Sequence, residues 1–407
     1  MSPPRPLPPL SPSRARLGVS LLFFTNGALL SALLPRYPEF KSAFGLSNSE
    51  FGFLVVAFGL GAILAAGFAG RSIRRFGTQR TSAVGSTVLA GALALAGCTI
   101  DLTHGLWIFV AATLVAGAVD AVVDAAQNVQ GVLVEEWRQK SVLNSFHALW
   151  STGAATGGVV GAVSAAANVH PGVQMVASGI VWAAVAILAA RLAAVPAEVS
   201  LGLDPESTAA PVGHIGSVRP RAWRLLMPLV TLAICGTLIE DVANNWAVLY
   251  LTEETEAPTA LAGLGLTVAL ASQFVGRMLG DPMTDRWGRA AVARSGGLVI
   301  AAGALLIVLA PSYLVAFAGF ALAGFGSATL VPAAFAAAGR IPGLAEGTGI
   351  AILGWLMRLG FLLTSPIIGW VSDLSSLRVA MLIGVGAGLL AVLVARSLRR
   401  PASAFQE

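Results

Sequence analysis

Charged residues are scarce in this chain of 407 residues, and so are cysteine and histidine. Only 11% of the residues are Asp, Glu, Lys or Arg, against about 25% in ordinary soluble domains. Apolar residues make up 56%, and the mean hydropathy is +0.80. This composition excludes a soluble enzyme and a disordered protein. The two cysteines, Cys98 and Cys235, lie in apolar runs, so they offer neither a disulfide framework nor the spacing of metal ligands.

Motifs for catalysis and cofactor binding are also missing from the sequence. It contains no phosphate-binding loop, haem ligand set or nucleophile elbow, and its four histidines form no cluster. We therefore expect a protein that is not an enzyme, binds no metal and carries no cofactor. Any work that it does must then draw on another energy source, of which a proton gradient is the simplest.

Long apolar runs fill the rest of the chain, with short polar breaks between them. About 20 apolar residues suffice to cross a bilayer as a helix, and backbone groups in lipid must be paired internally. We predict an all-α integral membrane protein with 12 transmembrane helices in two six-helix bundles. The predicted spans are 17–35, 50–70, 81–100, 106–132, 144–167, 173–194, 224–251, 260–280, 291–310, 312–338, 347–371 and 377–396.

A polar, proline-containing stretch in the middle of the chain separates the two predicted bundles. We therefore expect a cytoplasmic N-terminal tail at 1–16, an N-terminal bundle at 17–194, a cytoplasmic linker at 195–223, a C-terminal bundle at 224–396 and a cytoplasmic tail at 397–407. The first segment lacks the apolar core of a signal peptide.

The basic residues predict the orientation. With the N-terminus in the cytoplasm, 21 of the 25 Lys and Arg fall on the cytoplasmic side, and only Arg36, Lys41 and Arg378 fall outside. This is the imbalance of the positive-inside rule. We expect a multi-pass protein of the cytoplasmic (inner) membrane of a bacterium, with both termini in the cytoplasm. The net charge of +5 then reflects topology, and we expect no nucleic-acid partner.

Two basic loops indicate an internal repeat. The segment 70–77 follows the second span and 281–289 follows the eighth, and each contains an Arg-aromatic-Gly sequence. Their glycines, Gly77 and Gly288, lie 211 residues apart, about half the chain. Internal duplication is common in secondary transporters. The alternative explanation is that the two loops resemble each other only because cytoplasmic loops are generally basic.

The second of these loops resembles the signature of the major facilitator superfamily. The resemblance rests on Asp285-Arg-Trp-Gly-Arg289, and it implies that Asp285, Arg286 and Arg289 lock the cytoplasmic helix ends in one conformation. The sequence departs from the signature in two places. Asp281 stands where the signature usually begins with Gly, and Arg74 occupies the acidic position of the first loop.

Four further stretches resemble the YbjJ-like branch near the fucose permeases. They are 124–128, 144–150, 240–251 and 332–343, and the resemblance covers most of the chain from 17 to 400. It implies a transporter that works by alternating access. It does not specify the substrate, because the branch mixes sugars with unknown solutes.

Five charged residues fall inside the predicted spans: Asp120, Asp124, Glu240, Asp241 and Arg358. Each costs about 2.5–3.5 kcal/mol at a helix centre on insertion scales. Such residues form either a network that holds helices together or a path for substrate or protons.

The fourth span places three polar residues on one face, because Asp120, Asp124 and Asn128 are spaced at i, i+4 and i+8. Such a stripe accepts a proton, binds a cation or receives hydrogen bonds from hydroxyl groups. The resemblance places this span near the central cavity and favours Asp124. Polar packing against a neighbouring helix is the alternative.

The seventh span carries a wider polar patch. Glu240 shares a face with Asn244, Asp241 shares the adjacent face with Asn245, and Trp246 adds an aromatic wall or simply packs. Neighbouring carboxylates repel when both are ionised, so one is expected to be protonated. Glu240 is the candidate for proton coupling.

Arg358 lies near the middle of the eleventh span, beside Trp355. It is expected to be the only intramembrane base, and since it cannot lose its proton it needs a carboxylate. Glu240 or Asp241 is the expected partner, or Arg358 holds a substrate carboxylate bidentately. At the inner end of the fifth span, His147 is expected to pack at an interface, and a role in pH sensing is the alternative.

The intramembrane acids and the missing ATP motif favour proton coupling. The resemblance to sugar permeases implies a secondary active transporter, a symporter that imports a small polar, sugar-like solute. The alternative is a proton-coupled exporter of drug-like or natural-product molecules. We expect it to work as a monomer in the lipid bilayer. The predicted proton-coupling residues are Asp124, Glu240, Asp120 and Asp241. The predicted substrate-binding residues are Asn26, Asp124, Asn128, Glu240, Asn244, Asn245, Trp246, Gln273, Trp355 and Arg358.

Overall fold

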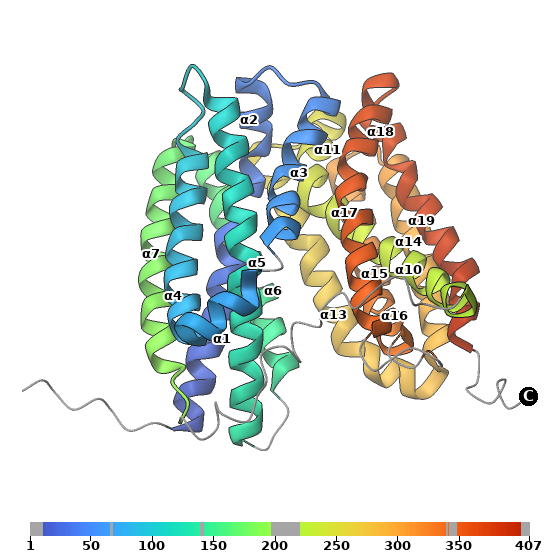
Figure 1. The fold of residues 1–407 in the computed structure, drawn as a ribbon. Helices are drawn as coiled ribbons and strands as arrows, with labels where there is room; N and C mark the ends of the chain where they lie inside the picture. Colours follow the sequence, from blue (N-terminus) through green and yellow to red (C-terminus); the bar gives the residue numbers. More distant parts are fainter. Residues whose placement is uncertain are drawn as a thin grey trace, which may run out of the picture.

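Two helical bundles lie side by side in the computed structural model (Figure 1). The structure describes residues 11–65, 68–138, 142–196, 220–338, 341 and 348–399, and these ranges contain helices and turns but no strand. Ten helices in them are long and apolar enough to cross a membrane. The predicted all-α fold with two six-helix halves is confirmed.

The N-terminal half begins with a span in three pieces. These are α1 (Pro12–Ser31), a short 3-10 helix η1 (Leu34–Arg36) and α2 (Tyr37–Ala43). The other helices of this half are α3 (Asn48–Ala65), α4 (Ala69–Gly97), α5 (Gly105–Arg138), α6 (Leu143–Ala166) and α7 (Pro171–Leu192). Helix α1 begins before the predicted Leu17, because Pro12 suits a first helical turn and Ser11 caps the backbone N–H of Arg14 at 3.3 Å.

The C-terminal half contains several interrupted spans. Its first span consists of α10 (Pro220–Asp241), a π-helical segment η4 (Val242–Trp246) and α11 (Ala247–Thr255). The next elements are α12 (Thr259–Ala262), α13 (Leu264–Trp287), α14 (Arg289–Val308), α15 (Tyr313–Ser327) and α16 (Leu330–Ala338). The last are α17 (Thr348–Leu374), α18 (Leu377–Ala380), α19 (Leu382–Val394) and η5 (Ala395–Arg399). Most of the predicted linker, 197–219, and the ends 1–10 and 400–407 lie outside the described residues.

The two glycines of the predicted repeat share one unusual backbone conformation. Gly77 has φ 76° and ψ 160°, and Gly288 has φ 80° and ψ 150°. A positive φ is costly for a residue with a Cβ, whereas glycine adopts it freely. Gly77 lies at a kink inside α4, and Gly288 lies between α13 and α14. This match of geometry supports the duplication of the two halves.

The halves touch at the end of the bundles that lies away from the start of α1. There α3 packs against α17, and α6 packs against α12 and α13. A Cβ at Gly52 would lie 2.5 Å from the Ser365 carbonyl oxygen, and one at Gly369 would lie 2.3 Å from that of Asn48. Glycine is therefore required where the backbones of α3 and α17 meet. We call this the closed end.

Polar contacts reinforce the closed end. The Asp373 carboxylate on α17 accepts the backbone N–H groups of Asn48 and Ser49 at 2.9 and 2.8 Å. The Lys41 ammonium on α2 lies 2.6 Å from the Glu253 carboxylate on α11. Both contacts join the N-terminal half to the C-terminal half. They hold the ends of opposing helices together.

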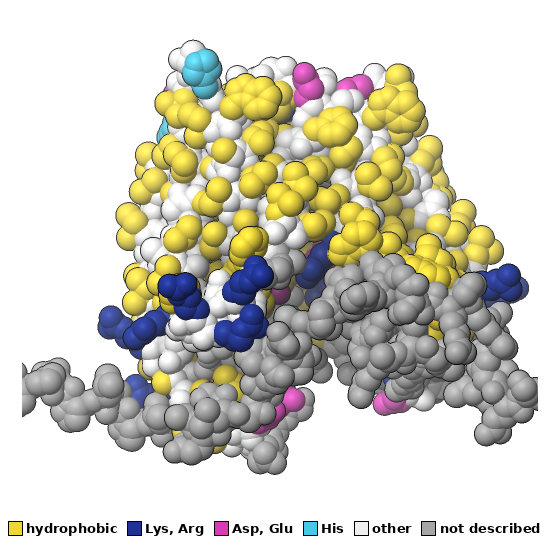
Figure 2. Space-filling model, in the orientation of Figure 1, with side chains coloured by type: hydrophobic (Ala, Val, Ile, Leu, Met, Phe, Trp, Pro, Cys, Tyr) yellow, Lys and Arg dark blue, Asp and Glu magenta, His cyan; other side chains and the backbone are white. Residues whose placement is uncertain are grey.

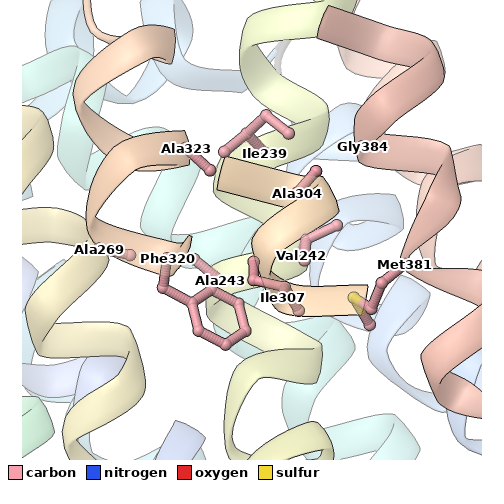
Figure 3. A pocket seen from close by; sticks show the side chains of 10 residues that line it. All are labelled: Ile239, Val242, Ala243, Ala269, Ala304, Ile307, Phe320, Ala323, Met381 and Gly384. Atoms are coloured by element: carbon pink, nitrogen blue, oxygen red, sulfur yellow. The ribbon is translucent and has the colours of Figure 1, made fainter. Parts of the chain in front are cut away.

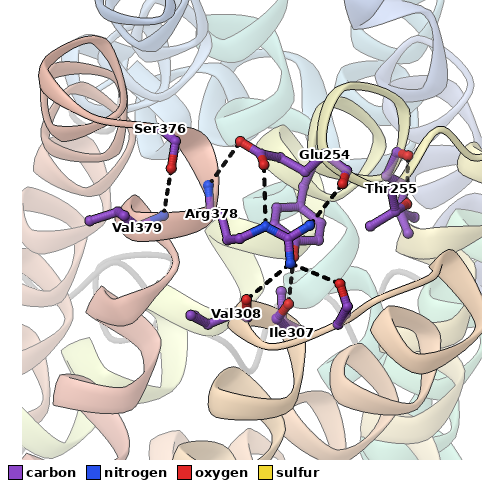
Figure 4. Close-up of polar contacts among 10 residues, drawn as sticks. Glu254, Thr255, Ile307, Val308, Ser376, Arg378 and Val379 are labelled. Atoms are coloured by element: carbon purple, nitrogen blue, oxygen red, sulfur yellow. Dashed lines mark hydrogen bonds and ion pairs between the residues drawn. The ribbon is translucent and has the colours of Figure 1, made fainter.

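A second set of contacts at this end stabilises each half separately. In Figure 4 the Arg378 guanidinium lies against Glu254 and against carbonyl groups at the end of α14. In the other half Arg36 is 1% exposed, lies 2.6 Å from Glu39, and donates to the Val169 carbonyl. These bases, predicted to lie outside the membrane, are structural partners of carboxylates and helix ends.

Basic side chains gather at the opposite end, which we call the basic end. Figure 2 shows them there, below a wide belt of hydrophobic side chains. The loop between the second and third spans contributes Arg71, Arg74, Arg75 and Arg80. The helices of the two halves diverge toward this end (Figure 1). The apolar belt marks the part of the surface suited to lipid.

Candidate functional site between the two halves

Helix α17 places Arg358 where the two halves begin to separate. Leu362, one turn nearer the closed end, still touches α3, because its Cδ2 lies 2.7 Å from where a Cβ at Gly59 would be. Residues four apart share a helix face, so Arg358 points from α17 toward the same N-terminal half. Its side chain is exposed, although it lies within the span 352–374. The position combines a permanent charge with access from outside the bundle.

From the N-terminal half, Asp124 faces this arginine. Asp124 lies on α5 and is exposed, and it interacts electrostatically with Arg358 on α17 and with His147 on α6. The amide of Asn128 donates to the Asp124 side chain at 3.0 Å and to its backbone carbonyl at 2.8 Å. The predicted face of Asp124 and Asn128 therefore lies between the halves. His147, for which packing was favoured over a pH role, is exposed, and its ring contacts Phe23 edge-on.

The C-terminal half supplies a second acid with its own base. The Arg277 guanidinium on α13 lies 3.8 Å from the Glu240 carboxylate on α10. The amide of Gln273, one turn before Arg277, lies 3.4 Å from the same carboxylate and 3.3 Å from the Ser327 hydroxyl. Arg277 also interacts electrostatically with His147 of the other half.

These contacts define the inter-half cluster: Asp124, His147, Glu240, Arg277 and Arg358. Its members come from five helices and from both halves. The amides of Asn128 and Gln273 border it. Acids, bases and amides in such an arrangement bind polar solutes and exchange protons.

The predicted partner of Arg358 was wrong. Glu240 pairs with Arg277, and Asp241 is hydrogen-bonded elsewhere. Arg358 makes no hydrogen bond or ion pair within the described ranges, and the carboxylate that interacts with it is Asp124 of the other half. The reason is geometric, because its face of α17 is turned toward the N-terminal half.

The prediction that Arg358 is the only intramembrane base was also wrong. Arg277, counted on the cytoplasmic side, lies in the apolar span 259–280. Its neighbour Gln273 lies four residues earlier on the same face, and both reach Glu240. The seventh span contains two acids, Glu240 and Asp241, for which only one base was predicted. The acid left without a base was the signal that could have located another base on an adjacent helix.

Asp241 belongs to a sealed network beside the cluster. Its carboxylate is 1% exposed and accepts from Asn245 at 2.7 Å and from Ser365 at 2.6 Å. Trp246 is fully buried, donates to Ser365 at 3.0 Å and packs its ring edge-on against Phe51 at 5.3 Å. This network lies at the contact of η4, α17 and α3.

The neighbouring Asn244 is partly exposed. The substrate roles of Asn244, Asn245 and Trp246 stay predictions, as does the proton-coupling role of Asp241.

Asp120 forms a third network, inside the N-terminal half. The Asn26 amide on α1 donates to the Asp120 carboxylate at 2.7 Å and accepts from the Trp150 indole at 2.8 Å. These two hydrogen bonds join α1, α5 and α6. Trp150 was not among the predicted site residues, although it ends the stretch 144–150 that carries the family resemblance.

An apolar pocket lies behind the π-helical segment, within the C-terminal half (Figure 3). Its lining contains no charged residue and consists of Ile239, Val242, Ala243, Ala269, Ala304, Ile307, Phe320, Ala323, Met381 and Gly384.

The residues predicted to act as a gate lie at the basic end. Asp285 and Arg286 are exposed, and the Arg286 guanidinium lies over the Trp287 ring, 5.9 Å from its centroid. Among the described residues, neither these two nor Arg289 forms an ion pair with the other half. Their gating role stays a prediction. The side chain of Asp281 is not among those that the structure describes.

The family model of the Major Facilitator Superfamily matches residues 19–254 and 229–407. The chain belongs to this superfamily of membrane transporters, as its two-bundle fold indicates. It is 31% identical over 344 residues to the transporter y4wD of Sinorhizobium fredii, covering 82% of this chain and 85% of that one. It is 28% identical over 395 residues to the membrane protein MosC of Rhizobium meliloti, covering 95% and 89%.

Solved structures share the fold at low sequence identity. The nucleoside transporter NupG (D323A mutant) superposes with a TM-score of 0.72 at 11% identity, covering 95% of this chain and 100% of that one. The D-xylose–proton symporter gives 0.72 at 17% identity, covering 96% of each chain. FucP in its outward conformation gives 0.62 at 18% identity, covering 95% and 99%.

Proposed function

We propose that this protein is a proton-coupled secondary active transporter that moves a small polar organic solute by alternating access. The observation that carries the proposal is the inter-half cluster. Charged groups of both halves meet where the closed end gives way to diverging helices. A site between two halves that separate at one end is accessible from one side of the membrane at a time.

The distribution of basic residues supports an orientation. The positive-inside rule favours a basic end that faces the cytoplasm, with both termini there. Our proposal includes the inner membrane of a bacterium as its location. The conformation is then inward-facing, with the closed end toward the outside. Our proposal includes a monomeric transporter, since one chain contains both halves that alternating access requires.

Glu240 is the leading candidate for proton coupling, with Asp124 as the second. Protonation of Glu240 removes one charge from the cluster and releases Arg277, which lies 3.8 Å away. A change in the charge balance between the halves shifts the equilibrium between inward-facing and outward-facing states, for which a few kcal/mol suffice.

The test uses proteoliposomes containing the purified protein. L-Fucose, D-xylose and a nucleoside serve as first solutes, because they represent the solutes of the three structural neighbours. We expect one of them to accumulate when an inward proton gradient is imposed. The variant Glu240→Gln should retain exchange of the solute but lose its pH-driven accumulation. Accumulation that persists unchanged in this variant would refute the role of Glu240.

The matched control is Asp101→Asn. Asp101 is an exposed acid that pairs with His170 at 2.8 Å within the N-terminal half, far from the cluster. This variant should accumulate solute as the parent does.

Export of drug-like molecules is the second candidate, and the exposed indole of Trp355 favours it. This side chain is 39% exposed beside Arg358 and offers an apolar surface to a hydrophobic solute. An exporter would extrude a lipophilic cation such as ethidium from loaded vesicles under a proton gradient and would leave the sugars untouched.

A further inference from the structure

Arg358 differs from three other bases that lie within the apolar spans. Arg36, Arg277 and Arg378 each have a carboxylate within 4 Å. Arg358 has no hydrogen-bond or ion-pair partner in the part of the chain that the structure describes, although a guanidinium carries five N–H donors. Its fork of donors is free to receive an acceptor from outside the protein.

The nearest opposite charge does not occupy this fork. Asp124 interacts with Arg358 electrostatically, but the two side chains form no ion pair within 4 Å. The Asp124 carboxylate instead accepts from Asn128. Arg358 therefore faces a carboxylate of the other half without forming an ion pair with it.

Four of the five amide side chains predicted to bind a solute are already engaged, all except Asn244. Asn26 bonds Asp120 and Trp150. The amides of Asn128, Asn245 and Gln273 each lie within hydrogen-bond distance of acceptors of the protein. A polyhydroxylated neutral solute would compete with these bonds, whereas an acid would use the free donors of Arg358.

Trp355 supplies a surface next to this arginine. It precedes Arg358 by three residues and Leu362 by seven, so all three share the face of α17 that is turned toward the N-terminal half. The indole is 39% exposed and lies nearer the basic end than Arg358. A solute entering from that end would meet the indole before the guanidinium.

We propose that the transported solute carries a carboxylate, which Arg358 binds bidentately while the carbon skeleton lies against Trp355. This inference rests on the proposed transport function and names the chemical class of its solute. Arginine is suited to this task, because its planar fork matches the two oxygens of a carboxylate.

The experiment measures binding without a gradient, by thermal stabilisation of the full-length protein in detergent. The probes are two matched pairs, D-glucuronate with D-glucose and 4-hydroxybenzoate with 4-hydroxybenzyl alcohol. A bound solute stabilises the folded state by mass action. We expect at least one acid to raise the melting temperature in a saturable way, and its neutral partner to have a much smaller effect.

Variants then test the residues. Arg358→Gln should weaken binding of the acid by about tenfold or more, since it removes a charge-assisted pair. Arg358→Lys keeps the charge but loses the fork, so it should bind with intermediate affinity; it also serves if the glutamine variant fails to fold. Trp355→Ala should weaken the aromatic acid more than the sugar acid. The control Arg191→Gln, an exposed base on α7, should bind as the parent does.

Three results would overturn the inference: neutral partners that stabilise as strongly as the acids, undiminished acid binding by Arg358→Gln, or no stabilisation by any acid. Its failure is distinguishable from failure of the proposed function. A neutral sugar that accumulates with protons while no acid binds would leave the transport function standing. Acid binding without any gradient-driven accumulation would overturn the transport function alone.

Discussion

The contact between Asp373 and the start of α3 leads to a prediction about which end of the molecule opens. The first turn of α3 is capped within its own half, because the Ser47 hydroxyl accepts the Glu50 N–H at 3.2 Å and the Glu50 carboxylate accepts the Ser47 N–H at 2.9 Å. The N–H groups of Asn48 and Ser49 remain, and Asp373 of the other half accepts both. One helix end is thus completed only while the halves touch.

The magnitude follows from the two hydrogen bonds. Replacing a capping side chain by alanine costs about 0.5–2 kcal/mol. Asparagine costs less, because its one acceptor oxygen keeps one of the two hydrogen bonds that Asp373 accepts. Asp373 is exposed, so solvent screening places its contribution in the lower half of this range. Asp373→Asn keeps the size of the side chain and removes its charge. A loss of about 1 kcal/mol changes the ratio of closed to open molecules at this end about fivefold.

Distances between spin labels report this ratio. Labels on Ala43 of the N-terminal half and Ser375 of the C-terminal half, in a protein whose Cys98 and Cys235 are replaced by serine, should give a short distance for the closed end. Asp373→Asn should increase the ratio of long to short distances about fivefold.

The control for this measurement is Asp101→Asn, which removes an exposed acid of the same end that contacts only its own half. Its distance distribution should match that of the parent. An unchanged distribution in Asp373→Asn would refute the reasoning, and so would an equal change in the control.

Two further predictions concern stability, measured as the melting temperature in detergent. Gly288→Ala should destabilise the protein by about 1 kcal/mol or more, because its φ of 80° disfavours a Cβ, whereas Gly91→Ala, at an equally uncrowded helical position of α4, should be neutral or stabilising; equal melting temperatures of the two variants would contradict this. Asn26→Ala should cost about 1–2 kcal/mol, since it leaves the Asp120 carboxylate and the Trp150 N–H without their partner, and an unchanged melting temperature would show that the network is not stabilising.

The fold could be predicted from the sequence because crossing a bilayer depends on composition over about 20 residues. Each predicted span coincides with helix in the structure, and Gly77 and Gly288 predicted a repeat that the backbone angles support. The interruptions could not be predicted. The π-helical segment 242–246 adds a residue to a helical turn, and hydropathy averaged over a span does not register it.

The sequence singled out three residues of the inter-half cluster, but it did not predict which acid pairs with which base. A charged side chain inside an apolar span is costly, and this cost singles out Asp124, Glu240 and Arg358 whatever the arrangement of the helices. Which acid meets which base depends on the rotation of each helix, and a single sequence does not contain it. Arg277 was missed for a related reason, because it lies near enough to the end of its apolar span to be counted with the loop beyond.

The glycines of the closed end set how the two halves recognise each other. At Gly52 and Gly369 the fit between α3 and α17 leaves less room than one methyl group. At these two positions the helices fit by close backbone contact and not by an interaction between side chains. The polar contacts of Asp373 and Lys41 that must break on opening lie at the helix ends. A single added carbon at either glycine would force α3 and α17 apart.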